Sequence, residues 1–183
     1  MKLAGLDIGT TGCKCTVFDD QGKYLNKAYR DYPVRRKVGS HEVDISVIMD
    51  GVYAVLKEMA GQYPDIAGVG VTSFGETFIM TDQSGKPLHT AMLYTDPHGE
   101  EECRELVQTI GKERMEQITG LYPHHMYSIS KMMWIKRHRP EVYQRAEHIF
   151  LMEDYVVWQL TGKRQIDYSL ATRTMAFDIQ KLS

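Results

Sequence analysis

The segment Asp7-Ile8-Gly9-Thr10-Thr11-Gly12 carries residue types that could hold a phosphate group. The apolar run from Leu3 to Ile8 predicts a strand that delivers Asp7 to its end, and a tight turn follows directly. Glycine lets backbone N–H groups approach an anion closely, and threonine hydroxyls add donors. A carboxylate beside them could hold Mg²⁺ through water, because Mg²⁺ keeps much of its hydration shell. The spacing matches neither a Walker loop nor a dinucleotide-binding loop, and an ordinary hairpin turn explains it equally well.

Two later segments carry residues that suit a polyhydroxylated ligand. Glu76 follows a predicted strand, Ile66 to Thr72, at the end where ligands bind in open α/β sheets, and its carboxylate could accept bonds from hydroxyls. Tyr94 and Asp96 pair an aromatic face with a carboxylate, which suits the C–H face and the hydroxyls of a sugar. Taken alone, a solvated loop glutamate explains the first segment and a turn before a helix explains the second. Each segment follows a predicted strand, and the carboxyl ends of these strands are expected to open on the same side of the sheet, so Glu76, Tyr94 and Asp96 are predicted to converge on one polar pocket.

The elements that must position these residues follow from hydrophobic periodicity and turn chemistry. Three strands joined by two tight turns are expected to be antiparallel neighbours, and an irregular polar connection, a helix and a buried parallel strand follow them. In chain order these elements are Leu3–Ile8, Cys13–Phe18, Lys23–Tyr32, the connection 33–42, a helix from Ile45 to Met59 behind the cap Asp44, and the strand Ile66–Thr72. This order predicts an α/β fold with a ribonuclease H-like (actin-like ATPase) core at residues 1–85 and a mostly helical part at residues 86–183.

Composition excludes several classes of protein. Of the 183 residues 43% are hydrophobic and 25% are charged, which is typical of a globular chain, and the net charge of −2 offers no basic field for a nucleic acid. No run approaches the roughly 20 apolar residues that cross a bilayer, and Asp7 interrupts the N-terminal stretch that a secretory signal would need. Three cysteines cannot all pair within one chain, which favours a reducing, cytoplasmic compartment.

Taken together, the segments resemble the FGGY family of carbohydrate kinases. Asp7–Gly12 resembles the family's N-terminal phosphate loop, Gly70–Thr77 its first substrate-binding segment, and Ala91–Asp96 its W-x-D segment, with Tyr94 in place of tryptophan. The later matches, in the family's order, are Ile118-Thr119-Gly120, Ser130-Lys131, Trp134-Ile135, Glu153-Asp154-Tyr155, Leu160-Thr161-Gly162 and Asp167–Met175. The joint specificity of these segments far exceeds that of any one of them.

This resemblance implies ATP-dependent phosphorylation of a sugar or polyol hydroxyl, with ATP and Mg²⁺ as cofactors. It implies that Asp7 serves the metal, and that the phosphates are bound by Gly9, Thr10, Thr11, Gly12 and Lys14. It places the substrate at Phe74, Gly75, Glu76, Tyr94, Asp96 and Met126. The aspartate that acts as general base lies downstream of Ser183 in the family, as does the nucleotide domain. Residues 1–183 are therefore expected to be an N-terminal domain, nearly inactive alone, of a cytoplasmic homodimer.

The substrate is less well specified than the family. Glu76-Thr77 and Ala171–Met175 resemble the glycerol kinase branch, but that branch has an arginine at the position of Gly75 and an aromatic residue at that of Met126. A ketopentose, as in xylulokinases, is the first prediction, and glycerol or another polyol is the alternative. A non-catalytic actin-superfamily module, regulatory or sugar-binding, is the alternative of another class, and a DNA-binding extension would favour a regulator.

Overall fold

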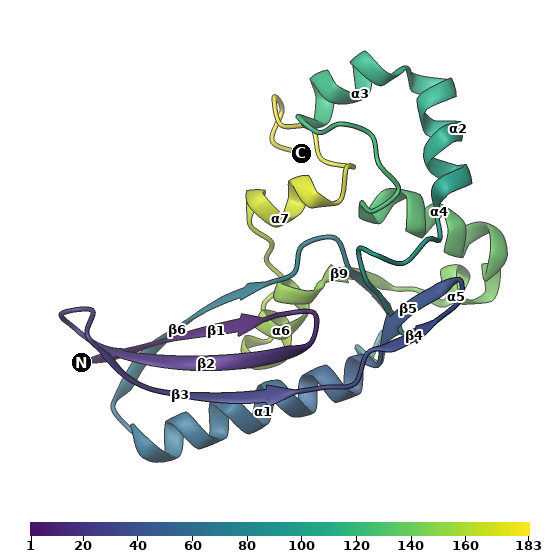
Figure 1. Ribbon diagram of the computed structural model, residues 1–183. Coiled ribbons are helices and arrows are strands. Elements are labelled where there is room, and N and C mark those ends of the chain that lie inside the picture. The colour runs from purple at the N-terminus through teal and green to yellow at the C-terminus, as the bar shows by residue number, and fades with distance from the viewer. The chain divides into compact units, whose positions relative to one another are not determined.

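The computed structural model describes residues 1–183 and divides into two compact units (Figure 1). The first unit comprises residues 1–34 and 43–74, and the second comprises residues 35–42 and 75–183. The chain therefore enters the second unit briefly before it returns to complete the first.

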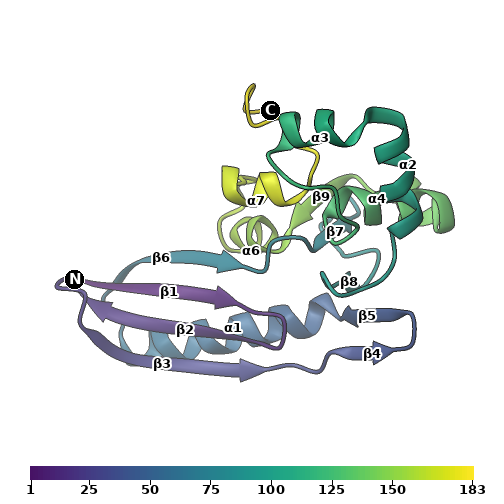
Figure 2. The ribbon, with the colours of Figure 1, turned by 45° about the horizontal axis from the view of Figure 1, so that its top comes forward.

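A four-stranded sheet forms the centre of the first unit, with the strand order β3-β2-β1-β6. Its members are β1 (Lys2–Ile8), β2 (Gly12–Asp19), β3 (Tyr24–Asp31) and β6 (Ile66–Ser73). β2 is antiparallel to β1 and to β3, whereas β6 is parallel to β1, as the arrows in Figure 2 show. The predicted antiparallel order of the first three strands and the parallel direction of the fourth are confirmed.

The helix α1 (Ile45–Gln62) packs along this sheet and contacts β2 and β3 (Figure 1). It begins behind Asp44, whose carboxylate accepts a hydrogen bond from the Ser46 N–H at 2.9 Å. The residues at helical spacing on its inner face are fully buried, including Ile48, Val52 and Val55. The helix predicted from that spacing is confirmed, and its apolar stripe covers one face of the sheet.

The prediction that the fourth strand is buried on both faces is wrong. β6 pairs only with β1 and lies at the edge of the sheet. None of its residues is buried, and Val69 is 44% exposed. The run from Ile66 to Thr72 contains glycines at 68 and 70 as well as β-branched residues, so its apolar character predicts a strand but not the number of its neighbours.

The connection at residues 33–42, predicted to be irregular, is instead a short β-hairpin. β4 (Arg35–Lys37) pairs with β5 (Ser40–Val43), and β8 (Ala91–Met92) completes a three-stranded sheet. The hairpin lacks the apolar alternation that signals a strand, because β4 is exposed along its whole length. Its pairing with a segment about 50 residues away is a tertiary effect that no local pattern reveals.

The remainder of the second unit is mostly helical around one further pair of strands. β7 (Phe78–Thr81) is antiparallel to β9 (His148–Leu151), so β7 belongs with the later part of the chain and not with the sheet of the first unit. The helices are α2 (Glu100–Ile110), α3 (Lys112–Thr119), α4 (Ser128–His138), α5 (Pro140–Arg145), α6 (Met152–Thr161) and α7 (Tyr168–Arg173). No helix combines the length and the hydropathy that a bilayer crossing requires.

Candidate functional site

The predicted metal-binding carboxylate lies near the end of β1 and is already paired. Asp7 stands opposite Lys14 in the β1–β2 ladder, and the Lys14 Nζ is 2.8 Å from the Asp7 Oδ2. This hydrogen bond and the charge of the carboxylate raise the pKa of the Lys14 ammonium. Both side chains are about half exposed, so the pair is open to solvent. A phosphate at this place would share Lys14 with Asp7.

The turn from Gly9 to Gly12 is held by bonds that leave the threonine side chains free. The Gly9 N–H donates to the Gly12 carbonyl at 2.9 Å, and the Tyr32 N–H donates to the Thr11 carbonyl at 3.1 Å. The buried Tyr32 hydroxyl donates to the Gly9 carbonyl. No hydrogen bond of the structure uses the hydroxyl of Thr10 or Thr11. Backbone hydrogen bonds and the Tyr32 hydroxyl thus fix the turn, and the hydroxyls of Thr10 and Thr11 remain available as donors.

Gly12 is required by packing, and not only by an approaching anion. A Cβ at this position would lie 2.2 Å from the Tyr29 hydroxyl oxygen and 2.7 Å from the Arg30 carbonyl oxygen. Its backbone φ is not in the left-handed region. The sequence assigned this glycine to phosphate binding, but β3 alone explains its presence.

The loop fits a hydrated magnesium–phosphate complex better than a metal held by protein ligands. Asp7 is a single half-exposed carboxylate, and no three His, Cys, Asp or Glu side chains in the structure are grouped to hold an ion. Mg²⁺ often binds through one or two carboxylates together with substrate phosphates and water. Asp7 and the free hydroxyls of Thr10 and Thr11 are compatible with that mode of binding.

Two of the predicted substrate residues, Glu76 and Asp96, lie near one buried lysine in the second unit. Lys131 is fully buried on α4, and its Nζ donates to the Leu93 carbonyl. Burial lowers the pKa of Lys131 to about 8, and the negative charges of Asp96 and Glu76 act in the opposite direction. Both carboxylates therefore act on the same ammonium, although 20 residues separate Glu76 from Asp96. We call Glu76, Asp96, Lys131 and Arg173 the charged cluster.

Asp96 is fully buried and accepts hydrogen bonds at both oxygens. The His41 N–H donates to Oδ2 at 2.7 Å, and the His98 N–H donates to Oδ1 at 3.0 Å. The His98 Nδ1 lies 2.7 Å from the same Oδ1. Asp96 is thus held by β5 and by its own loop. A carboxylate with these partners is rigidly oriented, and little of its accepting capacity remains for a ligand.

Glu76 is only 5% exposed, and α7 supplies its counter-ion. The Arg173 Nη2 donates to the Glu76 Oε1, and the Ser128 hydroxyl donates to the Glu76 backbone carbonyl at 2.7 Å. Arg173 is 97 residues from Glu76 in the sequence, and we did not predict it as a site residue. Only its place within Asp167–Met175, a segment matched to the family, could have drawn attention to it.

The other predicted substrate residues are not brought into the charged cluster. Tyr94 is 46% exposed beyond β8, and Met126 packs against the apolar group of Met115, Tyr127 and Met175. Phe74 is half-buried at the end of β6, and its N–H donates to the Ile8 carbonyl at 3.0 Å. Their part in a substrate site remains a prediction.

The reason given for the convergence of these segments is wrong. We expected them to follow strands whose carboxyl ends open on the same side of one sheet. Glu76 follows β6, whereas Tyr94 and Asp96 follow β8, which belongs to a different sheet. Glu76 and Asp96 instead share an electrostatic influence on the buried Lys131 of α4.

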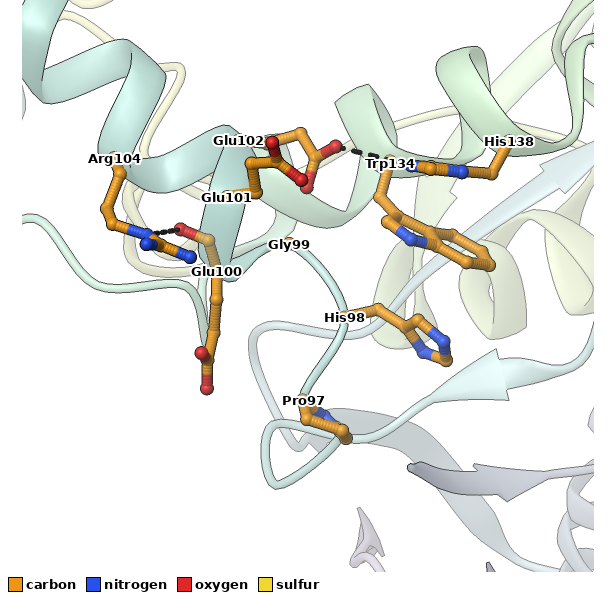
Figure 3. Close-up of a pocket in the computed structure, with 9 residues that line it drawn as sticks. All are labelled: Pro97, His98, Gly99, Glu100, Glu101, Glu102, Arg104, Trp134 and His138. Atoms are coloured by element: carbon orange, nitrogen blue, oxygen red, sulfur yellow. Dashed lines mark hydrogen bonds and ion pairs between the residues drawn. The ribbon is translucent and has the colours of Figure 1, made fainter. Parts of the chain in front are cut away.

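A cavity of about 260 Å³ adjoins Asp96 through His98 (Figure 3). The His98 ring lies 4.0 Å from the Trp134 ring, and the His138 ring stacks on Trp134 at 5.0 Å. Figure 3 shows Glu102 directed toward His138, with 3.7 Å between the Glu102 Oε1 and the His138 Nε2. None of the site residues predicted from the sequence lines this cavity. The aromatic rings at its wall contact one another.

A second polar hollow, of about 340 Å³, contains the buried carboxyl of Asp154 together with His148 and Arg164. Burial is the main cause that raises the pKa of Asp154 to about 7, and its Oδ1 has no hydrogen-bond partner. The Arg164 Nη1 lies 3.0 Å from the His148 Nδ1. Asp154 lies in the first turn of α6, where a carboxylate is favoured by the helix dipole. The raised pKa shows that the cost of burial exceeds this favourable effect of the helix dipole.

The sequence matches a family of known proteins over almost its whole length. Residues 3–183 match the model of the FGGY family of carbohydrate kinases, N-terminal domain. The chain belongs to the FGGY family. A glycerol kinase of Thermococcus onnurineus (strain NA1) is 34% identical over 98% of this chain, and a xylulose kinase of Staphylococcus xylosus is 26% identical over 97%. In each case the alignment covers 38% of the relative's length.

Solved structures agree with this assignment. The structure of Plasmodium falciparum glycerol kinase with ADP matches the whole chain with a TM-score of 0.92 at 25% identity, over 38% of that protein's chain. A ligand-bound xylulose kinase from Lactobacillus acidophilus matches with a TM-score of 0.93 at 24% identity, over 38% of its chain. The α/β fold is therefore that of FGGY kinase N-terminal domains, and this chain spans somewhat more than a third of the length of its relatives.

Proposed function

We propose that this chain forms the sugar-binding part of an ATP-dependent kinase that phosphorylates a hydroxyl group of a sugar or polyol. The family match over residues 3–183 is the observation that carries the proposal. The charged cluster supports it, because Arg173 orients the buried Glu76 carboxylate, and the charges of Glu76 and Asp96 both act on the buried Lys131. Fixed acceptors of this kind suit a ligand that is recognised through its hydroxyls.

In this proposal Glu76 binds the acceptor sugar, Asp96 orients the sugar site, and Arg173 holds the Glu76 carboxylate in place. Lys131 balances charge near both carboxylates. Asp7, Gly9–Gly12 and Lys14 face the phosphates of ATP, whose Mg²⁺ neutralises charge on the transferred group when it is bound. The general base is assigned to an aspartate in the sequence that follows the N-terminal domain in the family. We further propose a ribonuclease H-like core at residues 1–85, a helical part at 86–183, a C-terminal nucleotide domain and a cytoplasmic homodimer for the intact enzyme.

A ketopentose is our first proposed substrate, and glycerol or a related polyol is the second. Gly75 and Met126 differ from the residues of the glycerol kinase branch at those positions, which favours the ketopentose. The higher identity to glycerol kinases, 34% against 26%, favours glycerol. The two substrates share the chemistry that Glu76 would recognise, namely adjacent neutral hydroxyls.

The proposal predicts ATP-dependent phosphorylation when the intact enzyme is assayed with a panel of D-xylulose, D-ribulose, xylitol, glycerol and gluconate. The rate of ADP formation is followed in an assay coupled to a dehydrogenase reaction. The phosphorylated product is identified by ³¹P nuclear magnetic resonance. We expect turnover of at least one neutral member of the panel. Stoichiometric binding of a sugar without turnover would instead support a non-catalytic sugar-binding module, and neither binding nor turnover would contradict both readings.

Raising the pH from 7 to 9 is expected to weaken sugar binding by about three- to tenfold, since loss of a supporting charged contact costs roughly 1 kcal/mol. Lys131 is charged below its folded-state pKa of about 8 and neutral above it. Its loss of charge removes the favourable electrostatic interaction of Lys131 with Glu76 and Asp96. The contribution of Lys131 to folding stability changes with pH in the direction opposite to that of sugar affinity. Because the folded-state pKa lies below the usual value of 10.5, that contribution rises with pH between the two values.

These opposite trends are measured by calorimetric titration of the sugar and by urea unfolding at both pH values. Lys131→Met serves as the matched control, because it keeps most of the side-chain volume and removes the titrating group. The pH effects attributed to Lys131 should be absent from this variant. Equal loss of sugar affinity in wild type and Lys131→Met between pH 7 and 9 would contradict this role of Lys131.

A further inference from the structure

The absence of a side chain at Gly75 leaves space that the side chain of Arg173 occupies. A Cβ at position 75 would lie 2.9 Å from the Arg173 Cγ, and 3.3 Å from both its Cβ and its Nε. The stem of Arg173 therefore lies directly against the backbone that leads into Glu76. Gly75 has no positive φ, so the close approach of Arg173, rather than backbone conformation, accounts for glycine at this position.

The base of Arg173 is fixed by short contacts at both ends of α7. The Asp167 carboxylate caps the helix by accepting from the Leu170 N–H at 2.9 Å, and Leu170 itself is buried. Directly after Arg173, the Thr174 carbonyl accepts from the Ile129 N–H at 3.0 Å. These contacts hold α7 against the start of α4. The guanidinium is thus presented from a positioned backbone and not from a free loop.

The guanidinium itself lies between a carboxylate and an aromatic ring. Its Nη2 donates to the Glu76 Oε1, and its Cζ lies 5.6 Å from the centre of the Tyr127 ring. The Arg173 side chain is 40% exposed, whereas that of Glu76 is 7% exposed. A guanidinium has five N–H donors, so several remain available toward solvent beside the Glu76 carboxylate. A donor group and an acceptor group thus stand next to each other.

We propose that Arg173 is a specificity-determining residue that makes this site select neutral polyhydroxylated substrates over sugar acids. The proposal rests on the proposed kinase function and specifies its substrate class. A hydroxyl both donates and accepts, so it matches the pair of the Glu76 carboxylate and the Arg173 guanidinium. A substrate carboxylate would find no unpaired cation, because Arg173 is bound by Glu76 and Lys131 is buried with Asp96, Glu76 and the Leu93 carbonyl. The charged cluster holds two carboxylates and two cations, which balance each other.

The test compares wild type, Arg173→Gln, Arg173→Lys and Glu76→Gln in the intact kinase, with its preferred neutral substrate and with gluconate. For Arg173→Gln we expect the KM of the neutral substrate to rise about tenfold, with the KM of ATP unchanged. Arg173→Lys should recover only part of this loss, because an ammonium lacks the planar fork of a guanidinium. Glu76→Gln leaves Arg173 unpaired, and the ratio of kcat/KM for gluconate to that for the neutral substrate should rise about tenfold or more.

Gly75→Ala supplies a second, independent probe of the same contact. Its Cβ would displace Arg173, so it should reproduce the effect of Arg173→Gln on the KM of the neutral substrate. Added to Arg173→Gln, it should have little further effect, because the contact is already gone. Thermal unfolding of each variant identifies any that is lost to misfolding.

The outcomes separate this inference from the function on which it rests. If wild type phosphorylates a neutral substrate but Arg173→Gln leaves its KM unchanged, Arg173 has no part in specificity. The same conclusion follows if Glu76→Gln does not shift the preference toward gluconate, or if Gly75→Ala and Arg173→Gln are fully additive. If wild type prefers gluconate over every neutral substrate, the kinase function stands and the selectivity is wrong. If wild type phosphorylates nothing, both proposals fall.

Discussion

Replacing Asp7 with alanine in the intact kinase is expected to lower kcat by about 10²–10³-fold, the usual effect of removing one group that stabilises charge in a transition state. The KM of the sugar should change little, because Asp7 lies at the end of β1 beside the turn that we assign to the phosphates. Steady-state kinetics with varied sugar and varied Mg²⁺–ATP measure both parameters. The Mg²⁺ dependence should also shift to higher concentrations in the variant.

Asp20→Ala is the matched control for this experiment, because Asp20 is an exposed carboxylate in the turn after β2. It removes the same charge from the same unit and should leave kcat unchanged. Lys14→Ala separates the two members of the ion pair. It should raise the KM of ATP without abolishing turnover, because Lys14 is proposed to contact phosphates and not the metal. A change in Asp7→Ala that is confined to the sugar KM would mean that the phosphate loop has been misassigned.

The first unit was largely predictable because its signals are local. The strand that ends at Ile8, the turn at Gly9–Gly12 and the next strand follow one another in sequence, and alternation with turn residues suffices to order them. The helix behind Asp44 is likewise marked by its cap and its apolar spacing. What failed was the environment of β6, since an apolar run predicts a strand and not whether one or two strands lie beside it.

The second unit was less predictable because its site depends on long-range contacts. Glu76 and Asp96 were identified as candidates, but Arg173, which pairs with Glu76, comes from α7, and Lys131, whose charge is influenced by both carboxylates, comes from α4. A buried lysine has no local signature, since its charge is tolerated only by partners far away in the sequence. The hairpin of β4 and β5, which supplies the His41 N–H to Asp96, was missed for the same reason.

Glu76→Ala in the intact kinase is expected to weaken sugar binding by roughly 5- to 150-fold, since a lost buried partner of a substrate hydroxyl costs about 1–3 kcal/mol. Nucleotide affinity should barely change, because Glu76 is proposed to contact only the acceptor. Glu76→Gln keeps the shape and one acceptor oxygen, so its loss of affinity for the same neutral substrate should be smaller. Glu113→Ala, an exposed glutamate on α3, is the matched control and should bind the sugar as wild type does.

The most direct measurement of the central claim is isothermal titration of wild type, Glu76→Ala and Glu113→Ala with the preferred sugar or polyol and, separately, with ATP. If the charged cluster is the sugar site, only Glu76→Ala should weaken the binding of the sugar, and it should leave the binding of ATP unchanged. Thermal unfolding of Glu76→Ala guards against misfolding, because Arg173 loses its counter-ion in this variant. A folded Glu76→Ala protein that binds the sugar as tightly as wild type would contradict the assignment of this cluster to the substrate.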